Sequence, residues 1–222
     1  MQIILENAGK RFNRDWIFRS LNYTFSSGQA YAITGNNGSG KSTLLLSLSG
    51  ATALNEGRNL WHLQKEATPP LPEEQLHRYL TVVAPYLELI EEMTAMEFLK
   101  FHSAFKPLLP GISIEQVLEE VQLKTAADKQ IRYYSSGMKQ RIKLAQAFFT
   151  DVPVLLLDEP CTNLDTAGFD LYKTLISRYT TDRLVIVSSN DPQEYGFCHH
   201  RIDIRDYKTG KKSKPVTAFH GI

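Results

Sequence analysis

The chain has 222 residues, of which 42% are hydrophobic, which is enough for a sizeable core and fits one domain or one domain with an inserted lobe. Its formal net charge of +1 argues against a protein whose main partner is nucleic acid. The two cysteines, Cys161 and Cys198, match no disulfide framework or metal-binding spacing, which suits a reducing compartment. The start of the chain lacks the pattern of a signal peptide, and no stretch approaches 18 uncharged apolar residues. We therefore expect a soluble chain whose link to any membrane runs through a partner.

The N-terminal part of the chain predicts strands at residues 2–5 and 21–25, the second with clear alternation of large apolar side chains. Phe12 lies between them, directly after Lys10 and Arg11. In this place, shortly before a nucleotide-binding motif, an aromatic ring can stack on adenine through its face. An ordinary core position is the other interpretation, and spacing alone does not decide between the two.

A short apolar strand at residues 30–33 is followed by a glycine-rich loop and then by an apolar helix that Gly50 closes. The loop fits the GxxxxGK[ST] pattern without a mismatch. Its glycines let successive N–H groups point at one anion, and the helix N-terminus adds a favourable dipole. Lys41 is expected to reach the β- and γ-phosphates, and Ser42 to ligate Mg²⁺. The predicted nucleoside triphosphate site consists of Gly35, Asn36, Asn37, Gly38, Ser39, Gly40, Lys41, Ser42 and Thr43.

Past Gly57 the sequence becomes less regular, and the proline-rich residues 68–72 predict a turn or loop. A β-branched strand follows at residues 79–83, and Pro85 ends it.

Two capping boxes then predict two amphipathic helices, one capped by Thr94 and the other by Ser113. Two such helices between strands predict an inserted helical lobe over about residues 86–150. His102 lies on the apolar face of the first helix, where a packed residue is expected rather than a metal ligand.

The turn at residues 133–137 opens a basic amphipathic helix, which makes a second, weakly specific anion-binding N-terminus. Soon afterwards, four apolar residues at 154–157 predict a parallel strand buried on both faces. Asp158 and Glu159 stand at its carboxyl end, where open α/β sheets bind ligands. One carboxylate can hold Mg²⁺ while the other orients a water for attack on the γ-phosphate.

The phosphate loop, the Ser135-Ser136-Gly137 turn, the acidic strand end and residues 162–165, in this order and spacing, resemble an ATP-binding cassette domain over nearly the whole chain. The resemblance implies an α/β P-loop NTPase fold: a single cassette over residues 1–222, with a mainly parallel core sheet, an antiparallel N-terminal β portion and the helical subdomain. It also implies ATP and Mg²⁺ as ligands, with Asp158 in the metal shell and Glu159 as general base.

In that family the signature turn, which here contains Ser135, Ser136 and Gly137, closes on the triphosphate held by the opposite subunit. The resemblance therefore implies a head-to-tail dimer with a second copy or a homologous cassette, and two ATP molecules between them. It assigns Asp165 to the loop that crosses the dimer interface, and Phe12 to adenine stacking.

Two positions depart from the family pattern. A glutamine that contacts Mg²⁺ is expected after the strand at 79–83, but that place falls on Pro85, or on Ala84 with a one-residue slip. Glu88 is one possible substitute. A histidine that touches the γ-phosphate is expected after the strand at 184–187, and Asn190 stands there. An amide can still donate a hydrogen bond, but it cannot become cationic, so we expect slow but real hydrolysis.

The resemblance implies an ATP-hydrolysing subunit on the cytoplasmic, inner face of the cell membrane, driving a transporter whose membrane-spanning subunit is a separate chain. One alternative is a soluble cassette ATPase for assembly or repair. Another is an ATP sensor that binds without hydrolysis, which the two departures make conceivable. The lysine-rich tail at residues 206–214 is expected to be a solvated face rather than a lipid-binding patch.

Overall fold

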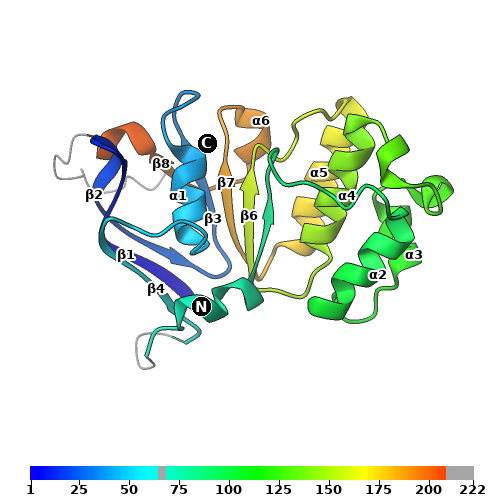
Figure 1. Cartoon of the computed structure of the whole chain (residues 1–222), viewed down its shortest axis with the longest axis horizontal. Helices are drawn as coiled ribbons and strands as arrows, with labels where there is room; N and C mark the ends of the chain where they lie inside the picture. The colour runs from blue at the N-terminus through cyan, green and yellow to red at the C-terminus, as the bar shows by residue number, and fades with distance from the viewer. Residues whose placement is uncertain (65–68, 209–222) are drawn as a thin grey trace.

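The computed structural model describes residues 1–64 and 69–208, and Figure 1 shows two sheets with helices on either side of the larger one. The smaller sheet is antiparallel, with strand order β2-β1-β4. Its strands are β1 (Gln2–Phe12), β2 (Asp15–Ser26) and β4 (Glu56–His62). This confirms the antiparallel β portion near the N-terminus.

The larger sheet is parallel throughout, with strand order β5-β6-β7-β3-β8. Its strands are β3 (Ala30–Thr34), β5 (Leu80–Val83), β6 (Val154–Asp158), β7 (Leu184–Ser188) and β8 (His200–Asp203). Because all strands run the same way, their carboxyl ends share one edge, where ligands bind in such sheets. The P-loop NTPase architecture expected from the sequence is confirmed.

The helices are α1 (Lys41–Leu48), α2 (Ala95–Phe105), α3 (Ile114–Glu120), α4 (Ser136–Phe148), α5 (Thr166–Tyr179) and α6 (Pro192–Tyr195). Short 3₁₀ turns occur at η1 (Glu73–Arg78), η2 (Lys124–Ala126), η3 (Ile131–Tyr133) and η4 (Ile204–Tyr207). In Figure 1, α1 lies between the two sheets, α4 and α5 lie on the other side of the parallel sheet, and α2 and α3 lie beyond α4. None of the helices in the described ranges is long and apolar enough to cross a bilayer.

The parallel sheet separates two hydrophobic clusters, and β6 contributes to both because its side chains alternate. Leu155 and Leu157 pack with α4 and α5, whereas Val154 and Leu156 pack on the side of α1 and the antiparallel sheet. All five residues of β6 are buried, as its apolar run predicts.

Several local predictions are confirmed. Thr94 and Ser113 each form a complete capping box with the residue three positions on, as the sequence predicts for α2 and α3. His102 is partly buried and packs through hydrogen bonds, with its Nε2 2.9 Å from Thr150 Oγ1 and its Nδ1 3.1 Å from Gln146 Nε2.

Other local predictions are wrong. The irregular stretch expected past Gly57 contains β4, which the polar side chains of that strand conceal. Within the region expected to form the helical lobe, residues 84–93 form a loop, and the first helix, α2, begins at Ala95. At the end of α2, Phe105 is 72% exposed and packs edge-on against Phe101. Residues 209–214 of the lysine-rich tail and Thr68 of the proline-rich loop lie outside the described residues.

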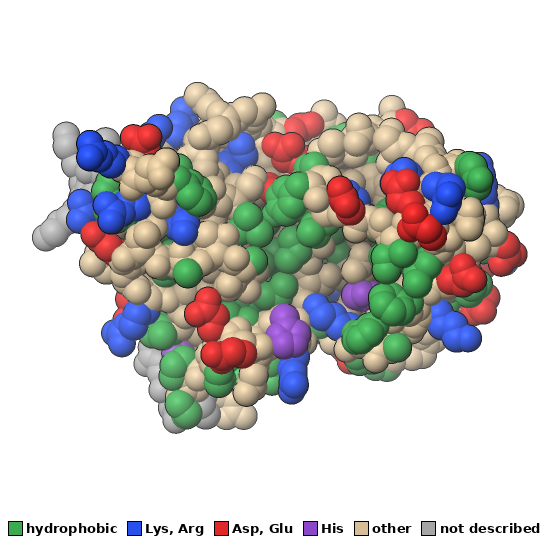
Figure 2. Space-filling model, in the orientation of Figure 1, with side chains coloured by type: hydrophobic (Ala, Val, Ile, Leu, Met, Phe, Trp, Pro, Cys, Tyr) green, Lys and Arg blue, Asp and Glu red, His purple; other side chains and the backbone are tan. Residues whose placement is uncertain are grey.

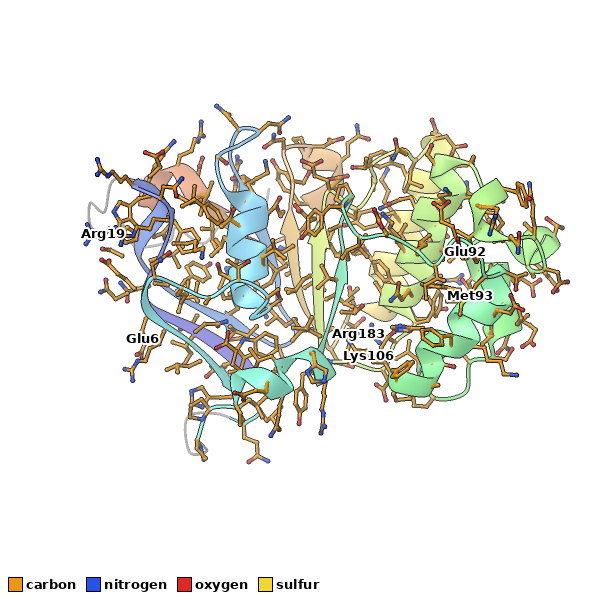
Figure 3. The ribbon with its side chains drawn as sticks, viewed as in Figure 1. Glu6, Arg19, Glu92, Met93, Lys106 and Arg183 are labelled. Atoms are coloured by element: carbon orange, nitrogen blue, oxygen red, sulfur yellow. The ribbon has the colours of Figure 1, made fainter. Side chains whose placement is uncertain are left out.

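Arg183 joins α4 to the sheet at the edge away from the phosphate loop (Figure 3). Its buried guanidinium donates to the carbonyls of Phe148 and Thr150, each at 2.9 Å. The Phe148 carbonyl belongs to the last turn of α4, where carbonyls lack partners within the helix, so Arg183 supplies a donor there. The Thr150 carbonyl also accepts from Val152 N at 3.0 Å.

Candidate functional site

The phosphate loop connects the carboxyl end of β3 to the first residue of α1. Gly40, at the N-cap of α1, has φ 107°, and a Cβ there would lie 2.1 Å from Ile17 Cγ2. Only glycine fits this conformation and this close approach. The first N–H groups of α1 have no partner inside the helix, so they are free to bind an anion.

A cavity of about 230 Å³ opens over this loop, and it brings together residues far apart in the sequence. Its lining includes Glu159 from the end of β6 beside residues of the loop and β2: Ile17, Asn37, Gly38, Gly40, Lys41, Ser42 and Thr43. Lys41 is buried, and its Nζ donates to the carbonyls of Gly35 (3.0 Å) and Asn36 (3.4 Å). The ammonium is therefore held over the loop, where a phosphate would lie.

Asp158 and Glu159 have different surroundings, although they are neighbours. Asp158 is buried, and its Oδ1 has no hydrogen-bond partner among the described residues. A buried carboxylate oxygen without a partner is costly unless something binds it. A divalent cation with oxygen ligands fits such an oxygen. The Ser42 hydroxyl, which the sequence pattern assigns to the same ion, lines the cavity together with Glu159, the neighbour of Asp158 in the chain.

Glu159 is partly exposed and has φ 44°, an uncommon conformation for a residue other than glycine. Its N–H donates to Ser188 O at 2.9 Å, which fixes the backbone between β6 and β7. The two neighbouring acids therefore have different surroundings, since Asp158 is buried and Glu159 lines the cavity over the phosphate loop.

Asn190 follows β7, the neighbour of β3 in the sheet. Its Nδ2 donates to Asn37 Oδ1, so the residue expected to contact the γ-phosphate touches the phosphate loop. An amide donor therefore lies at the edge of the site where the family pattern has an imidazole.

Phe12 lies at the end of β1, where the chain turns into β2. It is 52% exposed, which excludes the core interpretation. Lys10 Nζ lies 5.1 Å from its ring centroid, within cation–π range. The ring is free to stack on a planar ligand, and stacking on adenine stays a prediction.

The signature turn forms a second cluster, apart from the phosphate-loop cavity. Ser135 is the N-cap of α4, and its Oγ accepts from Met138 N at 3.2 Å. A Cβ on Gly137 would lie 3.1 Å from Asn163 O, so glycine lets the loop after β6 approach α4 closely. Both serines are exposed, which leaves the turn open to a partner.

Asp165 belongs to this second cluster. It is the N-cap of α5, accepts from Gly168 N at 2.8 Å and lies 3.4 Å from Arg141 Nη2 of α4. The backbone hydrogen bond from Gly168, with the Arg141 charge in support, lowers the pKa of Asp165. The structure therefore brings Glu159 and Asn190 to the phosphate loop, and groups Asp165 with the signature turn.

Residues 84–93, which we call the entry loop, run from β5 to α2. Burial raises the pKa of Tyr86 to about 12, and the Asp158 charge contributes to the shift, so this loop passes near Asp158. Glu88 instead lines a cavity of about 420 Å³ that also contains Lys139, Lys143, Ser136 and Pro85. The sequence interpretation overlooked these two lysines, although their spacing of four residues on a helix signals one shared face.

A larger cavity, of about 620 Å³, lies between the antiparallel sheet and β3–β8, and none of the residues expected at the nucleotide site lines it. Volume alone is therefore a poor guide to the site in this molecule. The clustering of the phosphate loop, Asp158 and Glu159 carries more weight.

Comparison with known proteins gives a family-model match to residues 18–162, and the model is described as ABC transporter. The chain is 32% identical over 203 residues to the cytochrome c biogenesis ATP-binding export protein CcmA of Nitrosococcus oceani, covering 91% of this chain and 87% of that protein. It is 28% identical over 205 residues to an uncharacterised ABC transporter ATP-binding protein of Bacillus subtilis, covering 89% and 85% of the two chains.

Solved structures agree on the fold. An ATP-binding subunit of an ABC transporter superposes with a TM-score of 0.75 at 19% identity, over 91% of this chain and 85% of that chain. A bacterial ABC transporter cassette solved as a dimer superposes with a TM-score of 0.72 at 22% identity, over 90% and 93% of the two chains.

Proposed function

The chain belongs to the ABC transporter family as an ATP-binding subunit, and we propose that it hydrolyses ATP in a head-to-tail dimer to drive a separate membrane-spanning subunit. The observation that carries this proposal is the cavity over the phosphate loop, which Lys41, Ser42 and Glu159 line together. Beside Glu159 in the chain, the buried Asp158 has a carboxylate oxygen with no hydrogen-bond partner among the described residues. Phosphate-binding N–H groups, a cation and two acids with separate surroundings are what phosphoryl transfer requires.

The residues divide the work as follows. The N–H groups at the start of α1 and the Lys41 ammonium bind the β- and γ-phosphates. Ser42 and Asp158 would hold Mg²⁺, which supplies positive charge to the phosphate oxygens when bound. Glu159 reaches the same cavity from the loop side, where its carboxylate can accept a proton from a water aligned with the γ-phosphate. Asn190, whose amide already contacts the phosphate loop, would donate a hydrogen bond that positions the γ-phosphate without supplying positive charge.

The dimer is supported by the separation of the two clusters. Within one chain, the residues that line the phosphate-loop cavity do not include Ser135, Ser136 or Gly137. The exposed signature turn would instead complete the site of the opposite subunit. Within the single cassette of residues 1–222, residues 86–150 would form the helical subdomain that carries this turn.

A membrane-spanning partner is supported by a group of exposed apolar side chains along the entry loop and α2. These are Tyr86, Leu87, Ile90, Phe101 and Phe105, with exposed fractions from 39% to 72%. Figure 2 shows apolar atoms over α2 on the face it displays. Large apolar side chains gathered on a surface indicate an interaction site, and we assign this one to the transporter subunit on the inner face of the cell membrane.

The test is steady-state ATP hydrolysis with Mg²⁺ by the purified chain, compared with Glu159→Gln. We expect the parent to turn over slowly and the variant to lose at least about 100-fold in kcat while still binding ATP, because only the proton acceptor is removed. If both proteins bind ATP and neither hydrolyses it, the chain is an ATP sensor whose closure is the signal, and the hydrolysis proposal fails.

A further inference from the structure

The far half of the entry loop, residues 91–93 next to α2, is attached to the segment that leads into α4. Arg132 N donates to Glu91 O, and Ile131 N donates to Met93 O, both at 2.9 Å. Gln130 Nε2 donates to Glu92 O at 2.9 Å. Figure 3 labels Glu92 and Met93, which lie where the loop reaches the helices. This half of the loop therefore moves with the signature turn.

The near half of the loop, which begins at Ala84 directly after β5, is attached to α4 through side chains of that helix. Lys143 Nζ donates to Ala84 O at 3.2 Å and to Pro85 O at 3.1 Å. Lys139 forms an ion pair with the Glu91 carboxylate further along the loop. Burial lowers the pKa of Lys143, while the Glu88 charge opposes that shift, so the ammonium is partly withdrawn from water.

The carbonyls of Ala84 and Pro85 lie at the end of β5, beside the end of β6. Ala84 and Pro85 come directly after Val83, which pairs with Leu157 of β6, and Asp158 and Glu159 follow Leu157. Lys143 lies two helical turns after Ser136, at the start of the same helix. Its hydrogen bonds therefore join the strand ends that carry the acids to the helix that carries the signature turn.

A gap remains between part of the loop and α4, although Leu89 packs against the core cluster that includes α4. The cavity of about 420 Å³ separates the two surfaces, and it is lined by Glu88 and Leu89 on one side and by Lys139 and Lys143 on the other. Across such a gap, a long side chain with several donors still reaches the backbone of the loop. A lysine has three donors, and two of them are used on these carbonyls.

We propose that Lys143 is a positioning residue, which holds the end of β5 at a fixed distance from the signature turn so that both move together when ATP binds. The proposal rests on the proposed function, since the movement matters only for turnover in the dimer. Lys143 touches no reacting atom, so its loss affects the rate and not nucleotide binding. This chain has no metal-binding side chain at Ala84 or Pro85, and the lysine supplies a mechanical link at that place.

The experiment compares Lys143→Met, which keeps the apolar stem, with Lys143→Arg, which keeps the donors, and uses Lys139→Met as the matched control. We expect Lys143→Met to lower kcat roughly 5- to 10-fold with KM for ATP and Tm unchanged, and Lys143→Arg to restore most of the rate. Lys139→Met should change kcat less than about twofold, because backbone hydrogen bonds hold Glu91. Hydrogen exchange at residues 86–90 should accelerate in Lys143→Met alone.

Unchanged kcat and exchange in Lys143→Met would overturn the proposal. So would an equal loss in Lys143→Arg, or a matching rise in KM or fall in Tm, since each shows a role other than positioning. A parent that binds ATP without hydrolysing it contradicts the proposed function instead, and the exchange comparison then still decides the role of Lys143.

Discussion

Asn190 is the residue at which we expect the chemistry of the proposed site to depart most from the family pattern. Its amide donates to Asn37 of the phosphate loop, and an amide stays neutral when it donates to a phosphate. Hydrogen bonds from a cationic donor to an anion are roughly twice as strong as neutral ones. We therefore expect Asn190→His to raise kcat by about tenfold at pH 7, with little change in KM. The measurement is steady-state hydrolysis, with Asn190→Ala as control, which should be slower than the parent. A histidine variant no faster than the parent would remove the charge argument.

At the same scale, the sequence predicts the residues whose chemistry is local in the chain. The phosphate loop is readable because nine consecutive residues make it, and Asp158 and Glu159 because a buried strand must end at the ligand edge of the sheet. Lys143 could not be predicted in the same way. Its role depends on α4 lying against the end of β5, which no pattern within α4 encodes.

Among the elements, α2 is held to the end of α4 by His102 in its neutral form. Thr150 Oγ1 donates to Gln146 O, so it accepts from His102 Nε2, which leaves Nδ1 to accept from Gln146 Nε2. A protonated ring would have two donors facing each other at Nδ1. Burial, with a smaller contribution from the Lys106 charge, lowers the pKa of His102 to about 4.

The pKa of His102 predicts how stability depends on pH. An unfolded histidine binds a proton near pH 6.5 and the folded one only near pH 4, so the free energy of unfolding should fall as the pH drops from about 6.5 towards 4. We expect about 1–2 kcal/mol from this residue, below the full linkage value because the ring is partly exposed. Urea unfolding at pH 7 and pH 5 measures it. In His102→Gln the loss over this interval should be smaller, and an equal loss in both proteins would contradict the assignment.

Elements with signals at their own ends were predicted, and those defined by distant pairing were not. The helices α2 and α3 begin with capping boxes, which are complete within four residues. Strand β4 exists because it pairs with β1, and its polar side chains form cross-strand ion pairs, Arg58 with Glu6 and Glu56 with Arg19 of β2. Polar strands of this kind lack the alternation that reveals half-buried ones.

For the whole molecule, the proposed head-to-tail dimer makes a prediction that mixing two inactive variants can test. Lys41→Ala disables the phosphate-loop side of a site, and Ser136→Glu disables the signature side. In a mixed dimer, one site then combines the two intact halves, so mixing the inactive variants should restore roughly a quarter of parental ATP hydrolysis by statistical pairing. The matched control mixes Lys41→Ala with Glu159→Gln, which both lie on the phosphate-loop side, and should restore nothing. Equal results from the two mixtures would exclude the shared site.

The strand order of the parallel sheet also determines when, during synthesis of the chain, the phosphate loop can fold and bind nucleotide. Strand β3, which leads into the phosphate loop, lies between β7 and β8, and its partners are residues 185–188 and 200–203. A nascent chain that has passed α1, and even β6, still lacks both neighbours of β3, so the loop has no rigid strand behind it. Because long-range parallel pairing forms late, nucleotide binding during synthesis is confined to its final stage. Truncated chains that end before β7 should therefore not bind ATP, so incomplete subunits should not compete with complete ones for nucleotide.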